Sequence, residues 1–126
     1  MAVIPYSCDF LAANVFLISW AGMTTNDTGA PYPFYRYVSH FTDKSAQAWG
    51  TFGGSTILLE GSNKVGPLID SDYDPIMDPA GINITWTAQA PLKQILPVFV
   101  QFRPRITGGA GSSINVTVMM VNKRTQ

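Results

Sequence analysis

The sequence is poor in the side chains from which catalytic and metal sites are built. Among 126 residues it has one cysteine, Cys8, one histidine, His40, and one glutamate, Glu60. A single cysteine excludes an internal disulfide, and one cysteine with one histidine cannot supply a closed zinc site. No Gly-x-Ser-x-Gly or other local catalytic signature occurs. We therefore expect no enzymatic activity, no catalytic residues, no cofactor and no resident metal.

Charge is also scarce. Charged residues make up 13% of the chain and the net charge is zero, whereas charged residues are about a quarter of an average protein. Without a net field or a basic face, we expect neither nucleic acid nor a membrane as a partner. A small protein with so few charges either presents neutral faces or covers part of its surface with another protein. The composition therefore favours a component of an assembly.

Long apolar runs are absent as well. The run Val15–Trp20 is far shorter than the roughly 20 residues that a membrane-spanning helix needs. No basic segment precedes it, so we expect no signal peptide and predict that the chain folds in a cytoplasm.

Alternation of apolar and polar residues is the strongest positive signal. It runs through three segments, in which every second side chain is expected to face a core. Shorter candidates precede them, and Gly-, Asn-, Asp- and Pro-rich turns separate them all. Such strands predict one all-β domain over residues 1–126, a β-sandwich or jelly roll of antiparallel sheets. One helical turn is predicted at Pro91–Leu96. The predicted strands are Val15–Ala21, Tyr35–Phe41, Ala46–Phe52, Thr56–Glu60, Ile82–Gln89, Val98–Arg103 and Ile114–Val121.

Three segments are candidates for contact with other proteins. The strand Thr56–Glu60 is apolar on both faces, which suits either a central strand or one covered by a partner. The segment Met1–Ala12 has no clear period, and we interpret it as an arm that docks on a neighbour. An aromatic run follows the first long loop. The predicted interface residues are Tyr32, Phe34, Tyr35, Tyr37, Ile57 and Leu59.

Two polar segments are candidate ligand sites. Asp70, Asp72 and Asp74 resemble the start of a calcium loop, but Pro75 stands where that loop needs glycine. A solvated acidic loop is favoured there, with a weak cation site as the alternative. The glycine-rich segment Gly108–Ser113 lacks the Gly-Lys-Ser/Thr of a phosphate-binding loop, so it is interpreted as a strand connection.

Three tryptophans, Trp20, Trp49 and Trp86, are interpreted as core residues or subunit contacts. The alternative is a platform on which sugars stack. Buried tryptophans would favour the first interpretation and solvent-exposed ones the second.

The segment Trp49–Asn63 carries Gly-Thr-Phe-Gly-Gly, a short apolar strand and Gly-Ser-Asn. Asp78-Pro79-Ala80-Gly81 follows, and then Arg103-Pro104-Arg105-Ile106-Thr107-Gly108-Gly109-Ala110-Gly111 before a last Val/Thr-rich strand. Over roughly residues 45 to 122 this order resembles the capsid decoration (cement) proteins of tailed bacteriophages. Lys64–Met77, rich in Asp and Pro, departs from that pattern, and residues 1–44 match none of it.

The resemblance implies a structural virion protein on the capsid surface, with a β-sandwich fold. Its implied partners are the major capsid protein and further copies of itself, as a trimer or dimer. Two alternatives stay open: a carbohydrate- or receptor-binding module of a tail or head fibre, and a tail or connector component.

Overall fold

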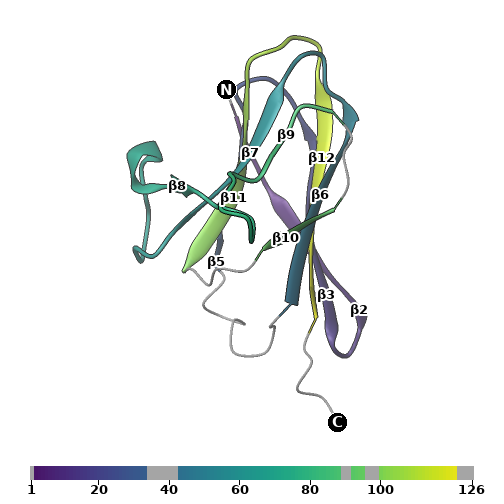
Figure 1. The fold of residues 1–126 in the computed structure, drawn as a ribbon, viewed down its shortest axis with the longest axis vertical. Helices are drawn as coiled ribbons and strands as arrows, with labels where there is room; N and C mark the ends of the chain where they lie inside the picture. The colour runs from purple at the N-terminus through teal and green to yellow at the C-terminus, as the bar shows by residue number, and fades with distance from the viewer. Residues whose placement is uncertain (1, 34–42, 89–91, 96–99, 122–126) are drawn as a thin grey trace.

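The computed structural model describes residues 2–33, 43–88, 92–95 and 100–121, and these residues form two facing β-sheets (Figure 1). The predicted all-β sandwich is confirmed. The described chain holds one short 3-10 turn, η2, at Asp70–Asp72 and otherwise consists of strands and loops.

The first sheet is antiparallel throughout and contains the three longest strands. Its central strand pairs along its whole length with both neighbours, so that residues far apart in the sequence form continuous rows across the sheet. From edge to edge the order is β10 (Lys93–Ile95), β6 (Asp43–Thr51), β12 (Ser113–Val121), β3 (Val15–Met23) and β2 (Tyr6–Ala12).

The second sheet is built on one long antiparallel pair, β7 (Thr56–Ser62) and β11 (Gln101–Thr107). Short strands complete it on both sides: two pair with β11, two pair with β7, and β1 pairs in parallel with β4. These are β1 (Val3–Ile4), β4 (Thr28–Gly29), β5 (Tyr32–Pro33), β8 (Asp74–Pro75) and β9 (Thr85–Trp86).

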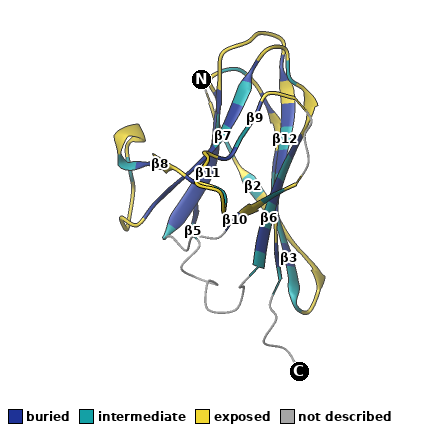
Figure 2. Cartoon of the chain, in the orientation of Figure 1, coloured by how far each residue is buried: buried dark blue, intermediate teal, exposed yellow. Residues whose placement is uncertain are grey.

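The core lies between the sheets. Buried residues alternate with more exposed ones along β3, β6 and β12, whereas most residues of β7 and β11 are buried (Figure 2). Of the three segments for which alternation was predicted, β12 shows it along most of its length. Trp20 lies at the centre of the core, and its indole N–H donates to the Ala30 carbonyl at 3.0 Å. Because the buried indole keeps a hydrogen bond, its large apolar area is buried without the cost of an unpaired polar group.

Residues 2–12 are not a free arm, which corrects the prediction for Met1–Ala12 as far as the structure describes that segment. β2 pairs antiparallel with β3, and β1 joins the other sheet. Tyr6 packs edge-on against Tyr32, with ring centroids 5.3 Å apart. The ring centroids of Phe10 and Phe16 are 4.7 Å apart. The alternation is hidden in the sequence because β2 is an edge strand whose side chains are largely exposed on both faces.

Two further predictions need correction, and one lies outside the described residues. Residues 93–95 form the strand β10 rather than a helical turn, because they pair with β6. Of the predicted strand Ile82–Gln89, β9 covers only Thr85–Trp86, and residue 89 is not described. The predicted strand Tyr35–Phe41 lies outside the described residues, as does His40.

The connection Gly108–Ser113 joins β11 to β12, as predicted. Gly109 has φ +72° and lies so close to the β6–β7 turn that a Cβ there would approach the Ser55 backbone nitrogen to 2.4 Å. The Ser55 hydroxyl donates to the Gly108 carbonyl at 2.8 Å, which ties the two turns together. Glycine is therefore required at this position for both conformation and space.

The Asp27 side chain forms hydrogen bonds both with Ala2, near the N-terminus, and with Thr24, in the turn after β3. Its buried carboxylate accepts hydrogen bonds from the Ala2 and Thr24 backbone N–H groups, at 3.0 and 2.9 Å, and from the Thr24 hydroxyl at 3.2 Å. Burial alone would raise the pKa of Asp27, but these hydrogen bonds outweigh it and hold the pKa below its ordinary value.

We expect Asp27→Ala to lower the free energy of unfolding by about 1.5–3 kcal/mol, because it removes hydrogen bonds to a charged acceptor. The pKa is lower in the folded state, so this contribution is full above the ordinary aspartate pKa and is lost as pH falls through the lowered one. Urea unfolding at neutral and acid pH measures both effects. Asp74→Ala, at an exposed position, is the matched control; equal losses in the two variants would contradict the prediction.

Candidate interaction surfaces

The outward face of the five-stranded sheet is the broadest regular surface of the described chain. The strand register places alternate residues of all five strands on it, and each is at least partly exposed. We call this surface the open face. It comprises Ser7, Asp9, Val15, Leu17, Ser19, Ala21, Asp43, Ser45, Gln47, Trp49, Gln94, Asn115, Thr117, Met119 and Val121.

The centre of the open face combines neutral polar and apolar side chains. Thr117 lies between Ser19 and Gln47, and this row is polar. One step along the strands, Met119 lies between Leu17 and Ser45. The two charges of the face lie at its margins: Asp9 is on the edge strand and Asp43 is at the first position of β6. The centre is therefore uncharged, as is typical of the buried core of protein interfaces.

The Thr117 hydroxyl oxygen is buried and has no hydrogen-bond partner among the described residues. Its neighbours in the row, Ser19 and Gln47, are themselves only partly exposed. Buried hydroxyls in proteins usually have a partner, either a protein group or an ordered water. The middle of the open face therefore has an unused hydrogen-bonding group.

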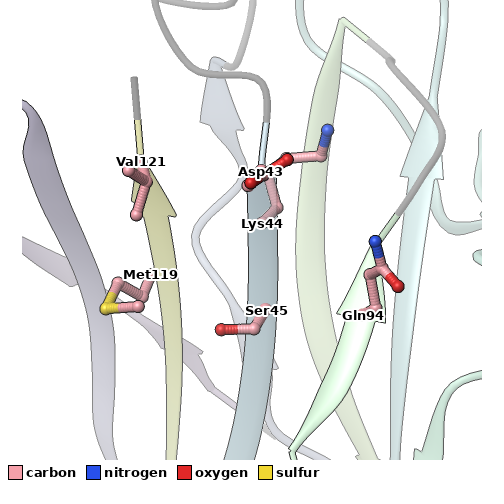
Figure 3. A pocket seen from close by; sticks show the side chains of 6 residues that line it. All are labelled: Asp43, Lys44, Ser45, Gln94, Met119 and Val121. Atoms are coloured by element: carbon pink, nitrogen blue, oxygen red, sulfur yellow. The ribbon is translucent and has the colours of Figure 1, made fainter. Parts of the chain in front are cut away.

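A small depression lies at the end of this face where β12, β6 and β10 are adjacent (Figure 3). Its volume is about 180 Å³, which is below the roughly 300–1,000 Å³ of typical small-molecule sites. Burial lowers the pKa of the lining residue Lys44, and the neighbouring Asp43 opposes that effect. The lining residues are Asp43, Lys44, Ser45, Gln94, Met119 and Val121.

The outward face of the second sheet, in contrast, is partly covered by the chain's own loop between β7 and β9, which contacts Arg103, while Arg105 on the same face is 37% exposed. Arg103 and Glu60 lie opposite each other on β11 and β7, and their side chains are 8% and 2% exposed. Arg103 Nε donates to Glu60 Oε2 at 2.7 Å, and the guanidinium lies 4.0 Å from the Tyr73 ring centroid. Arg105 Nε lies 3.1 Å from Glu60 Oε1 without hydrogen-bond geometry. Glu60 is therefore the acceptor of a buried ion-pair network.

Two carboxylates of the acidic loop form ion pairs within the chain, one of them with Arg103 of this network. Asp70 accepts from Arg103 Nη2 at 2.8 Å, and this contact holds the pKa of Asp70 below its ordinary value. Asp72 accepts from Lys64 Nζ at 2.6 Å and from the Ile69 N–H at 2.9 Å. Both carboxylates thus have cationic partners within the chain. Asp74 lies apart from them on β8, and among the described residues no three His, Cys, Asp or Glu side chains are grouped as metal ligands.

Burial corrects the predicted interface residues that the structure describes. Ile57 and Leu59 are 0% exposed, because they point from β7 into the core, and Tyr32 is 2% exposed. Their side chains are therefore not available to a partner. The strand Thr56–Glu60 is central, which was one of its two interpretations. Phe34, Tyr35 and Tyr37 lie outside the described residues.

The three tryptophans differ in burial. Trp20 and Trp86 are buried in the core, whereas Trp49 is 38% exposed and lies opposite Asn115 on the open face. Sequence reasoning recognised the alternation that builds the open face but not the face itself. The row that joins Ser19, Thr117 and Gln47 depends on pairing between strands up to about a hundred residues apart.

No helix among the described residues is long and apolar enough to cross a membrane.

Comparison with known proteins finds a solved structure of similar fold but does not assign the chain to a family. No protein-family model matches the chain, and no curated protein matches it. Among solved structures, the SPBc2 prophage-derived protein YomS is similar over 90% of this chain and 100% of its own, with a TM-score of 0.60 and 8% identity. A cupin domain from Bordetella pertussis Tohama I gives a TM-score of 0.48 at 12% identity, over 94% of each chain. An L-ribose isomerase from Cellulomonas parahominis gives 0.37 at 10% identity, over 86% of this chain and 50% of its own.

Proposed function

We propose that this chain is a structural protein of a bacteriophage particle, a decoration protein that binds the outer surface of the head and stabilises contacts between capsomers. The observation that carries the proposal is the open face. It is a broad outer sheet surface with an uncharged centre and an unused hydroxyl, whereas the loop between β7 and β9 covers part of the other outer sheet surface. A protein that adds stability by burying surface on a shell needs such a neutral contact face.

The phage setting is supported by two independent lines. The order of motifs from Trp49 to Val121 resembles phage decoration proteins. The fold extends over the full length of a protein described as prophage-derived. The major capsid protein is the partner that this role requires, and the capsid surface is then the location of the protein.

Copy number per particle tests the role directly. Quantitative mass spectrometry of purified virions should find this chain in amounts of the same order as the major capsid protein. A few dozen copies or fewer would place it instead in the tail, a fibre or a connector. Its absence from the particle would contradict the phage proposal altogether.

A sugar- or receptor-binding module is the second candidate, and the exposure of Trp49 favours it, since aromatic rings on a surface can stack on sugars. If it is correct, Trp49 fluorescence should respond to soluble oligosaccharides and Trp49→Ala should abolish the response. If the decoration role is correct, sugars should leave the fluorescence unchanged. Trp20 and Trp86 provide a constant background because both are buried.

A further inference from the structure

The strand β2 is a long edge strand. It has seven residues, lies at the end of the five-stranded sheet and, among the residues that the structure describes, pairs on one side only, with β3. Phe10 and Leu11 are 58% and 57% exposed. An exposed edge of this kind offers backbone N–H and C=O groups that pair readily with another strand.

β2 has few of the features that normally protect an edge. Proteins protect edges with charged side chains, above all lysine, with proline, with β-bulges or with very short strands. The register of β2 shifts only near its end, between Phe10 and Ala12. The opposite edge of the same sheet, β10, has three residues, one of which is Lys93. In the other sheet, β8 has two residues including Pro75, and β1 has two residues and is followed by Pro5. β2 has neither lysine nor proline, and Asp9 is its one charged residue.

We propose that β2 pairs antiparallel with β2 of a second copy of this chain, about a two-fold axis at Cys8, so that the five-stranded sheets of the two copies join edge to edge. The partner is a second copy because the strand is self-complementary in this register. The inference stands independently of the proposed function.

Symmetry and charge select the register. A two-fold axis perpendicular to the sheet must pass between two copies of the same residue, so the candidate centres are single positions of β2. An axis at Asp9 would place the two carboxylates directly opposite each other, which is destabilising. An axis at Phe10 would use the irregular part of the strand, where the pairing with β3 shifts between Phe10 and Ala12. An axis at Ser7 would pair only residues 6–8 within the strand.

An axis at Cys8 gives favourable pairs on both faces. On the core side, Tyr6 of each copy lies opposite Phe10 of the other, and aromatic cross-strand pairs are among the stabilising ones. On the outward side, Ser7 of each copy lies opposite Asp9 of the other, where the hydroxyl can donate to the carboxylate. The exposed Phe10 ring would thereby gain a cover.

The sign of a charge at position 7 tests this register. Ser7→Asp places two like-charge pairs with Asp9 across the axis, and Ser7→Lys places two opposite-charge pairs there. We expect the dissociation constant of the dimer to rise on the order of tenfold with Asp and to fall by a similar factor with Lys. The double variant Ser7→Asp with Asp9→Lys should restore dimerisation. Analytical ultracentrifugation over a range of concentrations measures all of these.

Cys8 supplies a second, independent readout. Opposite residues in an antiparallel pair have Cα atoms about 4.5–5.5 Å apart, so a short bismaleimide should crosslink the two thiols and produce a dimer on a denaturing gel. Burial raises the pKa of the Cys8 thiol, so the reaction is carried out at mildly alkaline pH. Cys8→Ser removes the crosslink and is the control. Crosslinking also tests the wild-type protein without any variant that must first fold.

Several outcomes would overturn the proposal. A chain that stays monomeric at all concentrations and does not crosslink would do so. A trimer would as well, because a two-fold edge pairing closes at two copies. A dimer that responds equally to Asp and Lys at position 7 would show that Asp9 is not opposite Ser7. An intact virion shell decorated by monomers would contradict the edge pairing and leave the proposed function standing.

Discussion

Glutamate in place of Thr117 is expected to abolish binding of the protein to phage heads while leaving its fold intact. Thr117 lies at the centre of the open face, between Ser19 and Gln47. If this face meets the shell, the new carboxylate is buried there without a partner. An unpaired charge in an interface costs several kcal/mol, typically 2–5, which corresponds to about a 30- to 5,000-fold loss of affinity.

Co-sedimentation with heads that lack the protein measures the loss, and thermal melting verifies the fold. Thr107→Glu is the matched control, because Thr107 is an exposed threonine at the end of β11 on the other sheet. Gln47→Glu is a milder companion that changes an amide to a carboxylate with almost no change of shape. If Thr117→Glu binds heads as tightly as Thr107→Glu, the open face is not the contact surface.

Removal of the Glu60 carboxylate is expected to give the largest loss of stability in the chain. Glu60→Ala leaves Arg103 buried, with Asp70 as its remaining carboxylate partner. Removing one partner of a buried ion pair typically costs about 3–5 kcal/mol. For a chain of this size the melting temperature should fall by about 10 °C or more. Calorimetry or denaturant unfolding followed by circular dichroism measures it.

Lys64→Ala is the control for this experiment, since it breaks the exposed ion pair between Lys64 and Asp72. The Lys64 side chain is 64% exposed, and exposed pairs contribute little to stability. The two variants should therefore differ widely although each removes one ion-pair partner. Similar melting temperatures would mean that the buried Glu60–Arg103 pair between β7 and β11 contributes no more to stability than the exposed Lys64–Asp72 pair.

Part of this fold follows from the sequence alone because alternation has a local cause. A strand with one face on a core alternates with period two, and β12 shows this in its sequence, where Ile114, Val116 and Val118 alternate with Asn115 and Thr117. The turn glycines are local in the same sense, since a positive φ at Gly109 is a property of one residue. Both features can be read without knowing which strand pairs with which.

Edge strands and covered faces could not be predicted in this way. β2 is largely exposed on both faces. Because neither face is fully buried, its sequence shows no alternation of apolar and polar residues and resembles that of an unstructured arm. Glu60 and Arg103 alternate as outward residues should, yet they are buried because a loop from another part of the chain covers them. Ile57 and Leu59 were predicted as contact residues because their strand is apolar on both faces, and the sequence does not show which of the two faces lies on the core.

The sequence by itself determined the class of the protein: one all-β domain, poor in charge, with neutral strand faces and few side chains suited to catalysis. The tertiary structure decided which neutral face stays open, because that depends on the pairing of β3, β6 and β12 across about a hundred residues. It also decided that β2 is an edge strand, paired on one side only among the described residues. Both are relations between distant segments, and local periodicity carries no information about them.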